Sequence, residues 1–111
     1  MKLLLDTHIL IWWPAGSPRL GAKAQAVIAA GETELFVSAA SWWELSIKRA
    51  IGRFDADLDL MRRALREREV GLLPVTFDHT EAAAMLPAHH GDPFDRMLVA
   101  QASLEVLDHR A

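Results

Sequence analysis

Short apolar runs alternate along this chain with longer segments of helical periodicity, and this alternation limits the fold more than any other feature. The first run, residues 2–6, contains three consecutive leucines and ends at Asp6. Two further runs lie at residues 34–37 and 71–75. Short runs of this kind are typical of strands buried on both faces, and the segments between them are long enough to cross back over a sheet. The pattern predicts an α/β domain in which helices cover both faces of a central parallel sheet.

Helices are expected where apolar residues recur every three or four positions and turn residues bound the segment. The expected helices cover residues 7–13, 18–31, 38–52, 55–70, 78–86 and 92–104. The element order is therefore β-α-α-β-α-α-β-α-α. A length of 111 residues suits one domain that spans residues 1–111.

The composition narrows the classes of function. The chain has no cysteine, which excludes disulfides, zinc thiolate sites and a thiol nucleophile. Asp6 and His8 interrupt the apolar stretch at the N-terminus, so neither a signal peptide nor a membrane span is expected. We expect a cytoplasmic protein that does not enter a membrane.

The distribution of charge leaves two interpretations open. The net charge of −3 does not by itself indicate a nucleic-acid binder. The segment from Lys48 to Arg68 is nevertheless basic, with seven basic residues against four acids. Such a segment can contact phosphates. It can equally be a solvated helix face or a surface for an acidic partner.

Three acids are expected beyond the carboxyl ends of the strands, where ligands bind in open parallel sheets. Asp6 ends the first strand, and Glu44 lies early in the helix that follows the second. Asp95 lies in the first turn of the last helix, which is apolar nearly all round, so we expect its side chain to be at least partly buried. The three carboxylates should therefore face one crevice.

Each acid also has an ordinary structural explanation. Asp6 can cap the helix that follows it, and Asp95 can interact with the dipole of its helix. Glu44 can form a capping box with Ser41 or an ion pair with Lys48, four residues later. Taken singly, none of the three acids identifies a site.

Taken together, the acids indicate a cation site. Two carboxylates about 4 Å apart repel by roughly 4 kcal/mol at an effective dielectric constant near 20. A hard divalent cation relieves this repulsion, and Mg²⁺, with Mn²⁺ possible, suits oxygen ligands. Such a site can activate water and stabilise charge on a phosphate. A phosphohydrolase with an Asp-x-Asp nucleophile is disfavoured, because His8 occupies the second acidic position.

Three stretches of the sequence resemble the PIN-domain toxins of the VapC type, in the order and at the spacing of that family. They extend over essentially the whole chain, and the stretch that begins at Asp92 is the most specific. The stretches are Leu3-Leu4-Leu5-Asp6-Thr7-His8, then Val37-Ser38-Ala39-Ala40-Ser41-x-Trp43-Glu44 with Lys48, and Asp92-Pro93-Phe94-Asp95-Arg96-Met97-Leu98-Val99-Ala100-Gln101.

The resemblance implies a three-layer α/β/α domain that cuts RNA with Mg²⁺ or Mn²⁺, forms a homodimer and is inhibited by a cognate VapB-type antitoxin. Asp6, Glu44 and Asp95 fall on the acidic pocket of the family and would be both its metal ligands and its catalytic residues. Glu44 would bind the metal or position the attacking water. Thr7 and Arg96 would support the pocket. The expected function is thus that of a Mg²⁺-dependent ribonuclease toxin that hydrolyses phosphodiester bonds.

Members of this family normally continue past the last helix into another strand, with a further acid in a Thr-x-Asp setting. Only residues 105–111 follow the last expected helix here, so we expect the final strand to be missing. Asp108 is a candidate for the further acid after a deletion, and a truncated reading frame would explain the same ending. The alternative to an active enzyme is a catalytically inactive PIN remnant that only binds antitoxin or dimerises.

Overall fold

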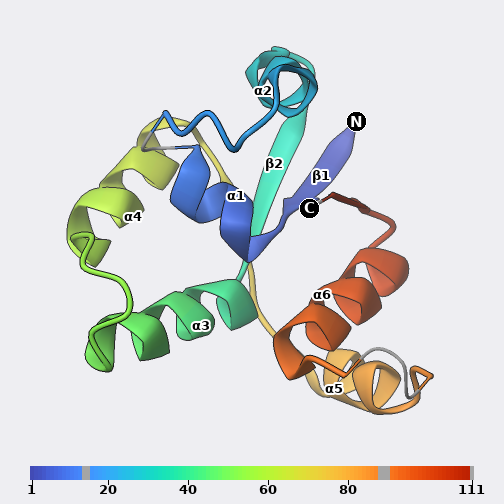
Figure 1. The fold of residues 1–111 in the computed structure, drawn as a ribbon. Helices are drawn as coiled ribbons and strands as arrows, with labels where there is room; N and C mark the ends of the chain where they lie inside the picture. Colours follow the sequence, from blue (N-terminus) through green and yellow to red (C-terminus); the bar gives the residue numbers. More distant parts are fainter. Residues whose placement is uncertain (14–15, 88–90, 111) are drawn as a thin grey trace.

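Four parallel strands form the centre of the protein in the computed structural model, which describes residues 1–13, 16–87 and 91–110 (Figure 1). Their order across the sheet is β3-β2-β1-β4, so β1 and β2 are internal. Leu3 of β1 lies opposite Leu35 of β2 on one side and opposite Asp108 of β4 on the other. The strands are β1 (Lys2–Leu5), β2 (Glu34–Ser38), β3 (Gly71–Leu73) and β4 (Asp108–Arg110).

Helices cover both faces of this sheet, as predicted. In Figure 1, α1 and α4 lie to one side of β1 and β2, while α5 and α6 lie together on the other side. The helices in the described part of the chain are α1 (Thr7–Trp12), α2 (Ala22–Ala29), α3 (Ala39–Ala50), α4 (Leu58–Glu67), α5 (Phe77–Ala84) and α6 (Pro93–Leu104).

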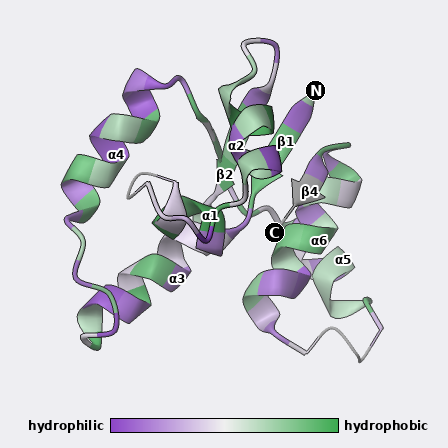
Figure 2. Ribbon diagram, turned by 45° about the horizontal axis from the view of Figure 1, so that its top comes forward, coloured by the Kyte–Doolittle hydropathy of each residue, from purple (hydrophilic) through white to green (hydrophobic). Residues whose placement is uncertain are grey.

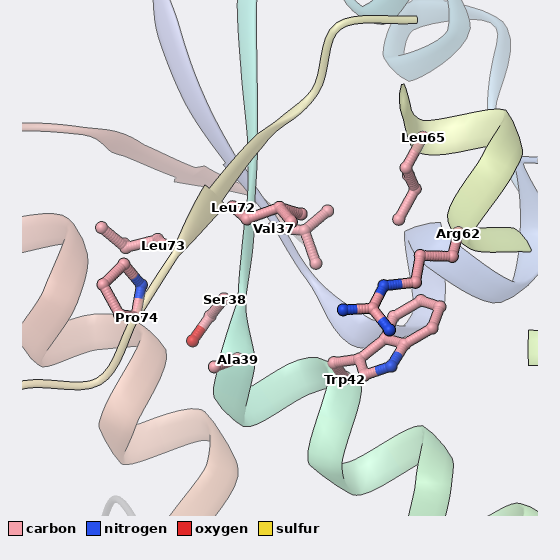
Figure 3. Close-up of a pocket in the computed structure, with 9 residues that line it drawn as sticks. All are labelled: Val37, Ser38, Ala39, Trp42, Arg62, Leu65, Leu72, Leu73 and Pro74. Atoms are coloured by element: carbon pink, nitrogen blue, oxygen red, sulfur yellow. The ribbon is translucent and has the colours of Figure 1, made fainter. Parts of the chain in front are cut away.

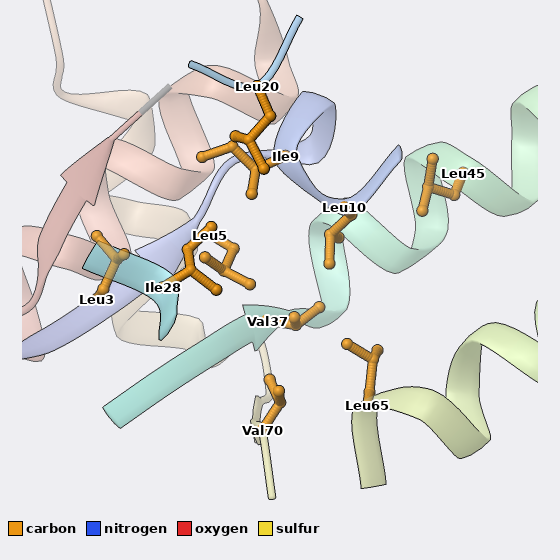
Figure 4. Packing of buried hydrophobic residues seen from close by; sticks show 10 residues of the cluster. All are labelled: Leu3, Leu5, Ile9, Leu10, Leu20, Ile28, Val37, Leu45, Leu65 and Val70. Carbon is orange, nitrogen blue, oxygen red and sulfur yellow. The ribbon is translucent and has the colours of Figure 1, made fainter. Parts of the chain in front are cut away.

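The alternation of side chains along β1 creates two separate cores. Leu3 and Leu5 point to the face covered by α1 to α4, whereas Leu4 points to the opposite face, toward α6. The larger cluster, drawn in Figure 4, consists of Leu3, Leu5, Ile9, Leu10, Leu20, Ile28, Val37, Leu45, Leu65 and Val70. The smaller cluster is built on Leu4, Leu98 and Ala102. Two cores on one sheet confirm the three-layer α/β/α architecture.

Helix α4 is amphipathic rather than apolar. Figure 2 shows hydrophilic and hydrophobic residues alternating around α4, whose buried residue Leu65 contacts the larger core. Among the described helices, none combines the length and the hydropathy that a membrane crossing needs. The apolar face of α4 packs against the larger core, whereas α3 also exposes apolar residues to solvent.

Most of the predicted helix boundaries are confirmed to within a few residues. Helix α3 begins after Ser38 and ends at Ala50. Gly52 follows its C-cap with a φ of 77°, and the backbone N–H groups of Gly52 and Arg53 donate hydrogen bonds to the carbonyl oxygens of Arg49 and Lys48. Helix α2 is shorter than predicted, because it begins at Ala22 instead of Pro18. The segment before it forms a turn in which Leu20 donates a backbone hydrogen bond to Ser17.

The prediction that the sheet lacks its final strand is wrong. Residues 108–110 form β4, which pairs in parallel with β1. The chain turns back from α6 through Val106, whose φ is 56°, and Leu107 donates a backbone hydrogen bond to Ala102. Asp108 is the first residue of this strand, and its side chain is exposed.

Candidate acidic site at the carboxyl end of the sheet

Asp6 occupies the junction between β1 and α1 and is only 5% exposed. Its Oδ1 atom accepts a hydrogen bond of 2.9 Å from the backbone N–H of His8, which caps α1, and lies 3.1 Å from Nδ1 of the His8 ring. The capping role considered from the sequence is therefore confirmed. A carboxylate has about four acceptor positions on its two oxygens, so the capping bond alone does not occupy all of them.

Glu44 lies inside α3 rather than at its start. The N-cap of α3 is Ser38, whose Oγ accepts from the backbone N–H of Ala40 at 3.0 Å, so a capping box between Ser41 and Glu44 is excluded. The alternative ion pair is present, with Oε2 of Glu44 at 3.4 Å from Nζ of Lys48. The Glu44 side chain is 17% exposed and thus lies at the edge of the packed interior.

Asp95 stands in the first turn of α6, directly after the cap. Oδ1 of Asp92 accepts hydrogen bonds from the backbone N–H groups of Phe94 and Asp95, at 2.8 and 3.4 Å, which confirms Asp92 as the N-cap. The expectation that Asp95 is partly buried is wrong, because its side chain is exposed. Burial along α6 begins one turn later, at Leu98.

Two side-chain contacts bring together the three segments that carry these acids. Oγ1 of Thr7, next to Asp6, lies 3.1 Å from Oγ of Ser41 in α3. The rings of Trp43 and Phe94 meet edge to face with centroids 5.4 Å apart, and these residues directly precede Glu44 and Asp95. The starts of α1 and α6 and the second turn of α3 therefore converge at the carboxyl end of β1 (Figure 1).

The donor atoms suit a hard cation, although the acids are not gathered around a common point. Carboxylate oxygens are the preferred ligands of Mg²⁺ and Mn²⁺. Within residues 1–13, 16–87 and 91–110, no three aspartate, glutamate or histidine side chains are close enough to hold one ion. The fold brings the segments together, and side-chain rotation would have to complete the ligand set.

Arg96 has a clear structural contact beside Asp95. Its guanidinium donates hydrogen bonds to the backbone oxygens of Ala83, Leu86 and Pro87 at 2.8, 2.9 and 3.0 Å. These carbonyls lie at and beyond the last turn of α5, where helical carbonyls lack partners within the helix. Arg96 thus holds the end of α5 against the first turn of α6.

Sequence reasoning missed a buried polar cluster between α5 and α6. His79 is buried, and its Nδ1 accepts from the backbone N–H of Thr76 at 3.0 Å, while its Nε2 lies 3.0 Å from Oε2 of Glu105. Nε2 of Gln101 lies 3.3 Å from the same Nδ1. The signal in the sequence was the spacing Thr76-x-x-His79, a capping box with histidine in the place of glutamate.

An apolar groove opens beside the acidic site, between α3, α4 and the ends of β2 and β3. It has a volume of about 400 Å³, and Figure 3 shows Arg62 reaching into it from α4. Arg62 is the one charged residue of the groove wall among the described residues. The lining residues are Val37, Ser38, Ala39, Trp42, Arg62, Leu65, Leu72, Leu73 and Pro74.

The PIN domain model matches residues 3–108, almost the full length of the chain. The chain belongs to the PIN-domain family. Within this family it is of the VapC type, because it is 34% identical over 104 residues to Ribonuclease VapC22 of Mycobacterium tuberculosis, with 90% of this chain and 78% of that protein covered.

A solved structure supports the same fold. A toxin–antitoxin complex from Klebsiella pneumoniae matches with a TM-score of 0.61 and 19% identity, covering 96% of this chain and 82% of that one. At this identity the likeness concerns the fold alone. The PIN fold assigned from the sequence is therefore confirmed by both the family match and the architecture.

The exposure of Asp95 predicts that its carboxylate contributes little to the stability of this PIN domain. Asp95→Asn should lower the free energy of unfolding by less than about 1 kcal/mol, since only an interaction with the helix dipole is lost. Leu98→Ala, one turn later in the core, should cost about 2–5 kcal/mol. Urea denaturation followed by circular dichroism measures both, and a loss of several kcal/mol in Asp95→Asn would contradict the exposed position.

Proposed function

We propose that this PIN domain is a metal-dependent ribonuclease and the toxin of a toxin–antitoxin pair. The observation that carries the proposal is the convergence of three acid-bearing segments at the carboxyl end of β1, joined by the Thr7–Ser41 and Trp43–Phe94 contacts. The match to Ribonuclease VapC22 supports RNA as the substrate. An RNA substrate and the lack of cysteine both favour action in the cytoplasm.

Asp6, Glu44 and Asp95 are the residues that would hold the metal, with Mg²⁺ as the expected ion and Mn²⁺ as an effective substitute. An ion held by these acids would supply activation of a water molecule and stabilisation of charge on the phosphate. Asp6 is buried and oriented by its capping bonds, so it supplies a fixed ligand. Asp95 is exposed and can turn toward the ion by a change of rotamer.

The test is cleavage of a mixed RNA pool by the purified protein with Mg²⁺ or Mn²⁺. We expect cleavage that EDTA abolishes and that Asp6→Asn and Asp95→Asn reduce at least about 100-fold, since even the outer partners of metal ligands are worth 10- to 100-fold. Asp59→Asn is the matched control, because Asp59 is also an exposed acid in the first turn of a helix, and that helix, α4, carries none of the three candidate acids. Its activity should remain within twofold of the wild type.

Two results would contradict this proposal in different ways. A folded wild-type protein that cleaves no RNA with either metal would favour the alternative of an inactive PIN remnant that only binds antitoxin or dimerises. Cleavage that survives in both Asp6→Asn and Asp95→Asn would leave the ribonuclease standing and refute the assignment of the site.

A homodimer is the second part of the proposal. Trp43 and Ile47 of α3 and its C-cap residue Ile51 follow one another at four-residue spacing, so they form one stripe, and all three are exposed. A continuous exposed apolar stripe favours an interface, and an isologous dimer can cover it with its own copy.

Sedimentation velocity tests the dimer. We expect the wild type to sediment as a dimer and Ile51→Asp as a monomer, because a charge would be buried in the interface. Leu60→Asp places the same charge at an exposed leucine of α4, outside the stripe, and should leave the dimer intact. A dimer that persists in Ile51→Asp would place the interface elsewhere.

The cognate VapB-type antitoxin is the third part, and the groove beside the acidic site is its proposed binding surface. The groove wall is apolar except at Ser38 and Arg62, and Arg63 and Arg66 are exposed on the same helix as Arg62. This combination suits a partner segment with apolar side chains followed by acids. An antitoxin is the proposed partner because the chain is similar to Ribonuclease VapC22 and shares its fold with a chain of a toxin–antitoxin complex.

Co-purification of the cognate antitoxin with tagged variants tests the groove. Leu72→Asp, in the groove wall, should weaken binding at least about 10-fold, because it places an unpaired charge in an apolar contact. Leu104→Asp changes an exposed leucine at the end of α6, outside the groove, and should bind as the wild type does. Equal binding by Leu72→Asp would show that the antitoxin uses another surface.

A further inference from the structure

A pair of buried hydroxyls links two of the elements that carry the candidate acids. Thr7 is 4% exposed and Ser41 is fully buried, and their hydroxyl oxygens lie 3.1 Å apart although the residues are 34 positions apart in the chain. Buried hydroxyls are normally hydrogen-bonded, because an unpaired one loses its contact with water without compensation. Among the described residues, each of these hydroxyls has the other as its hydrogen-bond partner.

Ser41 has no other evident task in the described structure. The sequence allowed it to cap α3, but Ser38 does so. Ser41 lies within the helix, three residues before Glu44 and thus on the same side of α3. Thr7 directly follows Asp6. The hydroxyl pair therefore joins the backbone that carries Asp6 to the turn of α3 that leads to Glu44.

We propose that Ser41 is a positioning residue for the acidic site: through Thr7 it fixes the rotation of α3 so that Glu44 faces the same ion as Asp6. The proposal rests on the metal-dependent function proposed above. A hydrogen bond between two short side chains is directional, so it limits rotation of α3 about its axis. The apolar contacts of the neighbouring residue Leu45 are not directional and allow more adjustment.

A merely stabilising role would leave metal affinity unchanged, and this difference makes the proposal testable. Mn²⁺ affinity is measured from the paramagnetic resonance signal of free Mn²⁺, and stability from thermal unfolding without metal. Ser41→Ala should weaken Mn²⁺ binding about 10-fold, the lower end of the effect of outer partners on metal sites. Ser46→Ala is the matched control, because its hydroxyl donates to the carbonyl oxygen of Trp42 of the same helix, at 2.8 Å, and bonds to no other element among the described residues; its affinity should stay within twofold.

Variants of Thr7 test the partner without altering α3. Thr7→Val removes the hydroxyl and keeps the shape of the side chain, so it should weaken Mn²⁺ binding as much as Ser41→Ala. Thr7→Ser keeps the hydroxyl and should retain the affinity. The double variant Thr7→Val/Ser41→Ala should be no weaker than either single variant, because both remove the same interaction.

Three results would overturn the proposal. Wild-type Mn²⁺ affinity in Ser41→Ala and Thr7→Val, with only a lowered unfolding temperature, would reduce the hydroxyl pair to a stabilising contact. An equal loss of affinity in Ser46→Ala would mean that α3 responds to any lost hydroxyl. A wild-type protein that neither binds Mn²⁺ nor cleaves RNA would remove the proposed function itself, and the positioning role with it.

Discussion

The burial of β1 on both faces is the constraint on which the rest of this structure depends. Leu3, Leu4 and Leu5 are at most 2% exposed, and burial of each contributes roughly 1.5–3 kcal/mol. Because successive side chains alternate, one strand supports the layer of α1 to α4 and the layer of α6 at once. Along β1 the leucine side chains separate the two layers of helices. Polar side chains from both layers can therefore come together at the end of this strand. Asp6 stands at this point.

Four of the six buried polar residues in the described part of the chain lie around the end of β1 and the start of α3, and the other two, His79 and Gln101, belong to the cluster between α5 and α6. Asp6, Thr7, Ser38 and Ser41 are all buried, although apolar residues in their places would avoid the cost of removing polar groups from water. Capping explains Ser38 and part of the burial of Asp6, but it explains neither Thr7 nor Ser41. A pair of hydroxyls in this position fits a region selected for geometry as well as for stability.

The order of elements followed from the sequence because local signals agreed with the global pattern. Capping residues such as Asp92 and the glycine at position 52 marked helix ends correctly. The strand β4 was missed because the turn before it uses Val106 at positive φ, where glycine is the usual signal. This strand is stabilised by its pairing with β1. Three residues are too few to show an alternating hydrophobic pattern from which such a tertiary contact could be predicted.

The sequence predicted which segments meet at the candidate site, but not how their acidic side chains are oriented. The reason for this difference is electrostatic. Carboxylates that share a crevice repel each other by several kcal/mol at about 4 Å, and the repulsion falls as their separation grows. For the protein alone, the lower-energy arrangement keeps the acids apart, which agrees with the exposed side chain of Asp95. Immobilising one side chain costs only about 0.5–1.5 kcal/mol. Turning the Asp95 side chain toward an ion would therefore cost little free energy. The position of α6 beside β1, by contrast, depends on the packing of the whole domain.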